Sequence, residues 1–209
     1  MRRWRRAAVA TKRQRRVTRP VEVGLADMGV AAETVKDIVI THLHYDHVGN
    51  FDLFPAATFH LQDLEMQYAT GRCMTVDAMR HAYEVEDVVG MVRRVYAGRV
   101  AFHHGDGEIA PGVTVHHVGG HTMGLQVVRV ATRRGWVVLA SDASHFYANM
   151  EHKRPYPIVY NVGDMVEGWR KARSLADSDA HVIPGHDPMV MERYPAPSKA
   201  LEGLVVRLD

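Results

Sequence analysis

The feature that most constrains this chain is a run of ligand-type side chains, His42-Leu43-His44-Tyr45-Asp46-His47, directly after a short apolar segment. The preceding residues, Ile38-Val39-Ile40, are β-branched, which is typical of a buried strand. Imidazole and carboxylate groups have no packing purpose at the end of such a strand, whereas histidine is the commonest side-chain ligand for transition metals. The run therefore predicts metal binding.

The spacing inside the run indicates which side chains can share an ion. His42 and His44 are two positions apart, so in an extended segment they point to the same side. Asp46 and His47 follow where the backbone turns, so they can face a second ion. Nitrogen and oxygen donors without thiolates suit zinc, iron, manganese or cobalt and argue against a structural zinc knot. Two ions roughly 3.5–4 Å apart can activate a bridging hydroxide as a nucleophile.

Three further ligand candidates each follow a predicted strand later in the chain, where the sheet holds the loops still. They are His121 in Gly119-Gly120-His121-Thr122, Asp142 in Ser141-Asp142-Ala143-Ser144, and His186 in Pro184-Gly185-His186-Asp187. They would add an imidazole for each ion and a carboxylate that can bridge both. The other histidines are interpreted as surface or core residues, since a lone histidine is seldom a ligand: His60, His81, His103, His104, His116, His117, His152 and His181.

The order of predicted elements favours an α+β fold in which helices cover sheets, because strands and helices are mixed without a regular alternation. We expect strands at residues 35–40, 58–61, 100–103, 113–118, 125–130, 136–140 and 181–183. We expect helices at residues 21–28, 63–69, 77–96 and 163–176.

Composition limits the remaining choices. A length of 209 residues with 46% hydrophobic residues predicts a single domain over residues 1–209. The net charge of +2 gives no reason to expect nucleic acid or a membrane as a partner, and no stretch is apolar enough to span a bilayer. The lone cysteine, Cys73, allows no internal disulfide and fits a cytoplasmic protein.

The N-terminus is unusually basic, with eight Arg or Lys and no acid in residues 1–16. A nucleic-acid or membrane arm is one interpretation. We favour a solvated leader over residues 1–20, or a start codon placed inside a longer reading frame, because the rest of the chain shows no matching basic patch.

The run from His42 to His47 resembles the HxHxDH signature of the metallo-β-lactamase superfamily, and His121, Asp142 and His186 resemble its later ligand motifs in the right order. Within that superfamily, the segments around Asp142 and His186 look most like the N-acyl-homoserine lactonases that quench quorum sensing. The resemblance runs from about residue 35 to the C-terminus.

The resemblance implies an αβ/βα sandwich with two divalent ions at one edge, zinc foremost. His42, His44 and His121 would hold the first ion, Asp46, His47 and His186 the second, and Asp142 would bridge them. A metal-bridging hydroxide would attack a lactone, a small-molecule ester, and Asp46 would pass a proton to the leaving alkoxide.

Two departures from the family leave alternatives open. The family tyrosine that binds the substrate carbonyl, three positions after the bridging aspartate, is replaced by His145, and Tyr147 lies two further on; either could donate a hydrogen bond. The family also has strands before the motif that we expect this chain to lack, leaving the first sheet incomplete and a homodimer open. A thioester hydrolase of the glyoxalase II type, and a truncated metal-binding chain without activity, are therefore kept as alternatives.

Overall fold

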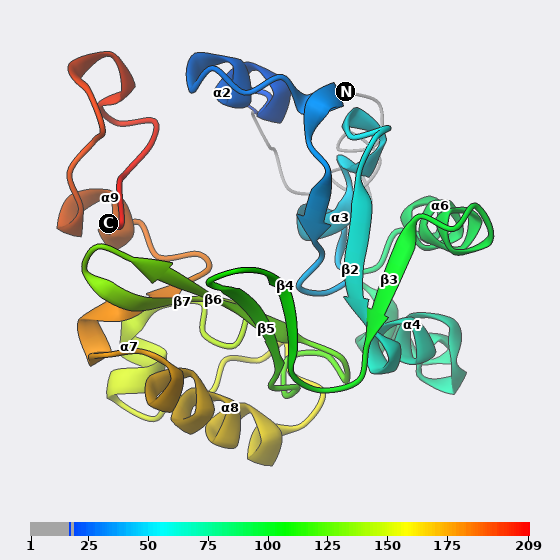
Figure 1. Ribbon diagram of the computed structural model, residues 1–209. Coiled ribbons are helices and arrows are strands. Elements are labelled where there is room, and N and C mark those ends of the chain that lie inside the picture. Colours follow the sequence, from blue (N-terminus) through cyan, green and yellow to red (C-terminus); the bar gives the residue numbers. More distant parts are fainter. Residues whose placement is uncertain (1–16, 18) are drawn as a thin grey trace. The chain divides into compact units, whose positions relative to one another are not determined.

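The computed structural model describes residue 17 and residues 19–209, which form two compact units. The first unit ends at residue 101 and takes in residues 1–61 and 69–101; the second takes in residues 62–68 and 102–209. The basic run at residues 1–16, and with it most of the leader predicted at residues 1–20, lies outside the described residues. One domain over the whole chain stays a prediction. The α+β class is confirmed, with strands in two sheets (Figure 1).

A three-stranded sheet, in the order β1-β2-β3, belongs mainly to the first unit. Strand β1 pairs with β2 in parallel, and Ile38 lies opposite Phe59. The strands are β1 (Asp37–Val39), β2 (Thr58–Gln62) and β3 (Val100–His103). The helices of this unit are α2 (Val21–Asp27), α3 (Tyr45–Val48), α5 (Asp77–Arg80) and α6 (Val85–Tyr96), with 3₁₀ turns η1 (Ala32–Thr34), η2 (Phe51–Leu53) and η3 (Arg72–Thr75).

The core of the first unit depends on α6, whose apolar residues recur at helical spacing. Val88 and Met91 are buried on one face of the helix. Gly90 permits a close approach, because a Cβ there would lie 2.3 Å from the Phe51 ring. The Arg94 guanidinium lies over that same ring, 4.0 Å from its centroid. Helix α6 therefore packs against Phe51, in the segment that follows the histidine run.

The predicted helix at residues 77–96 is wrong in one respect, because the structure divides it into α5 and α6. The interruption has a tertiary cause. The carbonyl oxygen of Ala82, between the two helices, accepts a hydrogen bond from the Tyr45 backbone N–H at 3.0 Å. A continuous helix would use that carbonyl internally. The strand expected at residues 35–40 is also shorter, since β1 covers only three residues.

The second unit contains a five-stranded sheet in the order β4-β5-β6-β7-β8. Its strands pair antiparallel except for β7 and β8, which are parallel. Strand β4 was not expected from the sequence. The strands are β4 (Gly107–Ala110), β5 (Val113–His117), β6 (Gln126–Thr132), β7 (Gly135–Ser141) and β8 (Val182–Pro184). The helices are α4 (Asp63–Thr70), α7 (Tyr147–Glu151), α8 (Val162–Leu175) and α9 (Met189–Arg193), with 3₁₀ turns η4 (Asp179–His181) and η5 (Lys199–Leu201).

Helix α8 covers one face of this sheet and forms a hydrophobic core with it (Figure 1). The Asn161 side chain caps the helix by accepting hydrogen bonds from the N–H groups of Gly163 and Asp164. Met165 and Trp169 are buried against β6 and β7. Helix α8 therefore supports one face of the sheet, and the loops at the strand ends extend from this supported sheet.

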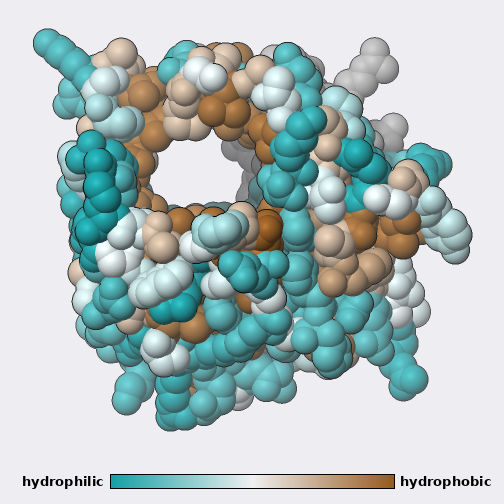
Figure 2. Space-filling view, viewed as in Figure 1, coloured by the Kyte–Doolittle hydropathy of each residue, from teal (hydrophilic) through white to brown (hydrophobic). Residues whose placement is uncertain are grey.

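On the face drawn in Figure 2, hydrophilic and apolar residues are interspersed. Among the described residues, no helix is both long enough and apolar enough to cross a membrane.

Candidate metal centre

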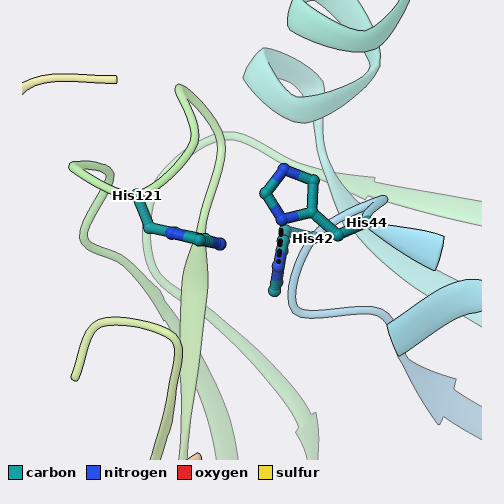
Figure 3. A group of neighbouring side chains, drawn as sticks. All are labelled: His42, His44 and His121. Carbon is teal, nitrogen blue, oxygen red and sulfur yellow. Dashed lines mark hydrogen bonds between the residues drawn. The ribbon is translucent and has the colours of Figure 1, made fainter. Parts of the chain in front are cut away.

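Two imidazoles meet just after β1, in the first unit. His42 Nε2 lies 3.1 Å from His44 Nδ1, and both side chains are buried (Figure 3). The Thr41 hydroxyl lies 3.2 Å from His42 Nδ1, on the other side of that ring. One nitrogen of His42 is thus engaged by a local partner, and the other faces the ring of His44.

Asp46 and His47 lie on α3, a single helical turn where the sequence predicted only a change of direction. His44 precedes the helix in an extended conformation, and its carbonyl oxygen accepts from the Val48 N–H. Asp46, in the first turn, complements the positive end of the helix dipole. The His47 ring lies 4.0 Å from the His42 ring. We refer to His42, His44, Asp46 and His47 as the 42–47 group.

The segment between α5 and α6 supports this group from one side. The Tyr83 ring packs edge-on against the His44 ring, with centroids 4.6 Å apart. The hydrogen bond from Tyr45 to Ala82 fixes the same two segments. Sequence reasoning missed Tyr83, because it placed this residue inside a continuous helix.

In the second unit, three imidazoles converge on the buried carboxylate of Asp142. His121 Nε2 lies 3.3 Å and His145 Nε2 2.9 Å from Asp142 Oδ2, and His186 Nε2 lies 3.2 Å from Oδ1. The side chains of Asp142 and His121 are 4% and 1% exposed, whereas that of His186 is 39% exposed. We refer to these four residues as the Asp142 group. An anionic carboxylate buried this deeply requires cationic or hydrogen-bonding partners, and the imidazoles face both of its oxygens.

The backbone around Asp142 is held by side chains from distant parts of the unit. The Tyr156 hydroxyl donates to the Asp142 carbonyl oxygen, and the Trp169 indole donates to that of Ala143. Burial, followed by the charge of Asp142, raises the pKa of Tyr156, so this hydroxyl keeps its proton. Ser141 adopts φ +46°, a left-handed conformation that an ordinary residue keeps only when its surroundings impose it.

His121 is oriented by a backbone partner. Its Nδ1 lies 2.7 Å from the Ile158 carbonyl oxygen, which can only accept, so Nδ1 is the donor. In a neutral ring this leaves Nε2, which faces Asp142, as the metal-binding nitrogen. Gly120, the preceding residue, is required sterically: its φ is +85°, and a Cβ would lie 2.5 Å from the Met165 backbone.

The parallel pairing of β7 with β8 brings His186 to Asp142. Ser141 lies opposite Pro184 in the register, so the loops after both strands begin side by side. The Gly185 N–H donates to the Ser141 and Ser144 carbonyl oxygens, each at 3.0 Å. The His186 N–H donates to the His145 carbonyl oxygen, also at 3.0 Å.

The two candidate substrate-binding residues lie in different surroundings. The His145 ring stacks on Tyr156, with centroids 3.7 Å apart, and belongs to the Asp142 group. The Tyr147 ring lies under the Arg193 guanidinium at 3.7 Å. Burial raises the pKa of Tyr147. Sequence reasoning missed Tyr156, whose only signal is its place between Pro155 and Pro157.

The donor atoms of both groups suit a divalent transition metal. They are nitrogen and oxygen only, and the donor atoms of His121, Asp142 and His145 lie within 4.8 Å of one another. Ligands about 2.1 Å from a tetrahedral ion lie about 3.4 Å apart, close to the contacts of Asp142 with His121 and His186. In the described part of the chain, the convergent groups of ligand side chains include none of the histidines interpreted as non-ligands.

Known proteins are similar to this chain in sequence and in fold. The sequence pattern of the metallo-beta-lactamase superfamily matches residues 7–186. The N-acyl homoserine lactonase AttM of Agrobacterium fabrum is 30% identical over 168 residues, which cover 77% of this chain and 61% of AttM. A lactonase from a Bacillus species is 29% identical over 133 residues, covering 63% of this chain and 48% of the relative. The chain thus spans about three fifths or less of the length of these two relatives.

Solved structures show the same fold. An N-acyl homoserine lactone hydrolase with the product N-hexanoyl-L-homoserine bound at its catalytic metal centre gives a TM-score of 0.68 at 22% identity, covering 82% of this chain and 64% of the other. AidC, a dizinc quorum-quenching lactonase in complex with a product, gives a TM-score of 0.61 at 16% identity, covering 78% and 61% of the two chains. At these identities the similarity establishes the fold.

Proposed function

Because the chain belongs to the metallo-beta-lactamase superfamily, we propose that the 42–47 group and the Asp142 group come together around two divalent metal ions in a lactonase. The reaction is hydrolysis of the ester bond in the ring of an N-acyl homoserine lactone. Water adds across the bond between the carbonyl carbon and the ring oxygen, and the product is the open N-acyl homoserine.

The observation that carries the proposal is the burial of Asp142 among three imidazole nitrogens at 2.9–3.3 Å. A carboxylate in such surroundings is a suitable bridge between two cations. Support for the substrate comes from AttM and the Bacillus relative, both of which are described as N-acyl homoserine lactonases.

In this proposal His42, His44 and His121 hold one ion, Asp46, His47 and His186 hold the other, and Asp142 is shared. The donor types suit zinc, with iron, manganese or cobalt as alternatives. When bound, the two ions would supply an activated water and polarise the ester carbonyl.

The chain's own residues would then orient the ligands and move a proton. Asp46 is an exposed carboxylate at the start of α3, and it would carry a proton to the leaving alkoxide. His121 would be held in its binding tautomer by the Ile158 carbonyl. Of the two side chains considered for the substrate carbonyl, His145 lies in the Asp142 group, whereas Tyr147 is engaged by Arg193.

The partner would be a small molecule, and the net charge of +2 gives no basis for nucleic-acid binding. The lone Cys73 supports a cytoplasmic setting. Assembly as a homodimer is testable by light scattering.

The direct test is incubation of the zinc-loaded protein with N-hexanoyl homoserine lactone while acid release is titrated. Release of one acid per ring, abolished by Asp142→Ala and retained in Asp179→Ala, would support the proposal. Turnover of a glutathione thioester without lactone opening would instead indicate a hydrolase of the glyoxalase II type. Metal binding without either reaction would indicate an inactive metal-binding chain.

A further inference from the structure

We propose that His145 is a metal ligand, binding beside His121 and Asp142 through its Nε2 atom. The inference rests on the proposed metal centre and gives it a donor beyond the seven residues assigned above. It also gives His145 a role different from the substrate hydrogen bond that the family resemblance implies for this position.

The first argument is the placement of the donor atoms. His121 Nε2 and His145 Nε2 both approach the same oxygen, Asp142 Oδ2, at 3.3 and 2.9 Å. Ligands about 2.1 Å from an ion lie about 3.4 Å apart at tetrahedral angles and about 3.0 Å apart at right angles. The two distances fall close to these spacings, and all three donor atoms lie within 4.8 Å of one another, an arrangement compatible with a single ion between them.

The second argument is that the His145 ring is held in this orientation. The Tyr156 ring stacks on the face of the His145 ring with an interplanar angle of 16°. The Tyr156 hydroxyl in turn donates a hydrogen bond to the Asp142 carbonyl oxygen. The His145 carbonyl oxygen accepts from the His186 N–H, which fixes the backbone. The His145 side chain is only 17% exposed. A side chain that is already held in its binding orientation loses less conformational entropy when it binds an ion.

The competing interpretation is a hydrogen bond in which His145 Nε2 donates to Asp142. A separation of 2.9 Å suits that bond as well. The two interpretations differ in one respect: a ligating Nε2 carries no proton, whereas a donating Nε2 carries one. Loss of metal affinity would not separate them, because removal of an outer partner of a ligand also lowers affinity by roughly 10–100-fold.

An extra nitrogen donor would raise the coordination number of the ion above four. Coordination by five or six ligands favours manganese, iron or cobalt relative to the tetrahedral preference of zinc. The visible absorption of bound Co²⁺ reports this number directly, because the bands gain intensity as the number of ligands falls.

The experiment compares the Co²⁺-loaded wild-type protein with His145→Phe, which keeps a flat ring against Tyr156 but has no nitrogen. The control is His104→Phe, at a side chain that is 86% exposed. We expect a severalfold rise in visible band intensity for His145→Phe and the wild-type spectrum for His104→Phe. Far-UV circular dichroism checks that both variants are folded.

A second measurement needs no variant. In the zinc-loaded wild-type protein labelled with ¹⁵N-histidine, we expect His145 Nε2 to show no one-bond coupling to a proton. A proton on that nitrogen, or an unchanged Co²⁺ spectrum in folded His145→Phe, would overturn the inference. Failure of the wild-type protein to bind Co²⁺ or zinc at all would overturn the proposed function itself.

Discussion

The two groups of candidate ligand side chains are built in opposite ways. The 42–47 group comes from six consecutive residues, and its backbone is shaped by one turn of helix, α3. The Asp142 group draws its members from residues 121–186, and its backbone is held by Tyr156, Trp169 and the pairing of β7 with β8. The first group therefore takes its backbone shape mainly from its own segment, with support from Ala82 and Tyr83, whereas the second depends on contacts from across a whole unit.

The difference predicts where each group is vulnerable. A local turn re-forms quickly and tolerates distant changes, whereas a group assembled from separate loops loses its geometry when a supporting contact is removed. Perturbations of equal size should therefore affect the Asp142 group more than the 42–47 group.

Metal removal should have the largest effect. A chelator should abolish hydrolysis, and for a metal supplied at 1,000 times its Kd it should lower the free energy of unfolding by roughly 4 kcal/mol. Hydrogen–deuterium exchange should increase more in residues 138–150 than in residues 38–50, because the former depend on non-local contacts. Equal increases in the two segments would contradict the contrast between the groups. Restored activity on adding zinc is the control for irreversible unfolding.

Replacement of Asp142, the proposed bridging carboxylate, should have the next largest effect. Asp142→Ala removes the group that three imidazoles face, so activity should fall by at least roughly 100-fold, more than is typical for an outer partner of a ligand. The matched control is Asp179→Ala, at a side chain that is 77% exposed. Metal analysis and steady-state kinetics check both variants, and wild-type turnover by Asp142→Ala would refute the assignment.

A smaller effect should follow from removing one supporting hydroxyl. Tyr156→Phe leaves the buried Asp142 carbonyl without this donor and should cost about 1–3 kcal/mol of folding stability. It should also lower metal affinity by roughly tenfold.

Tyr194→Phe is the matched control, because the Tyr194 hydroxyl donates to the Ala180 carbonyl oxygen at 2.6 Å in the same unit. Urea unfolding should show similar losses for both variants, with metal affinity reduced only in Tyr156→Phe. Equal metal affinity in Tyr156→Phe and Tyr194→Phe would show that packing around Asp142 does not affect metal binding.

The smallest effect concerns Asp106, which contacts Lys171 on α8 and His116 on β5. Burial raises the pKa of Asp106, but the hydrogen bonds and charges of Lys171 and His116 outweigh it and lower the pKa below 3.8. The ionised carboxylate therefore stabilises the fold above its unfolded pKa, and this contribution is lost as pH falls through the lowered value. Asp106→Asn should cost under about 1 kcal/mol at pH 7, because the side chain is half exposed.

Urea unfolding at pH 7 and at pH 3 checks this prediction. The difference between Asp106→Asn and the wild-type protein should shrink at pH 3, and metal affinity at pH 7 should not change. A stability difference between the two proteins that is larger at pH 3 than at pH 7 would contradict the lowered pKa of Asp106.

The sequence predicted the α+β class and most strands, because alternating and β-branched residues are local signals. It did not predict the division of residues 77–96, because the Ala82 carbonyl leaves the helix to meet Tyr45. Strand β4 was missed because Gly107 and Ala110 have low strand propensity, and pairing with β5 determines the outcome. The ligand candidates could be proposed from motifs, whereas Tyr156 could not, since only tertiary packing brings it to His145 and Asp142.

The parallel pairing of β7 with β8 also has a consequence for biosynthesis. At roughly 5–20 residues per second, the ribosome releases His42 to His47 several seconds before His186. Strand β8 cannot join the sheet until it has been made, so His186 reaches Asp142 only after that strand has been synthesised. In the proposed centre, the Asp142 group would therefore be completed after the residues of the 42–47 group have been synthesised.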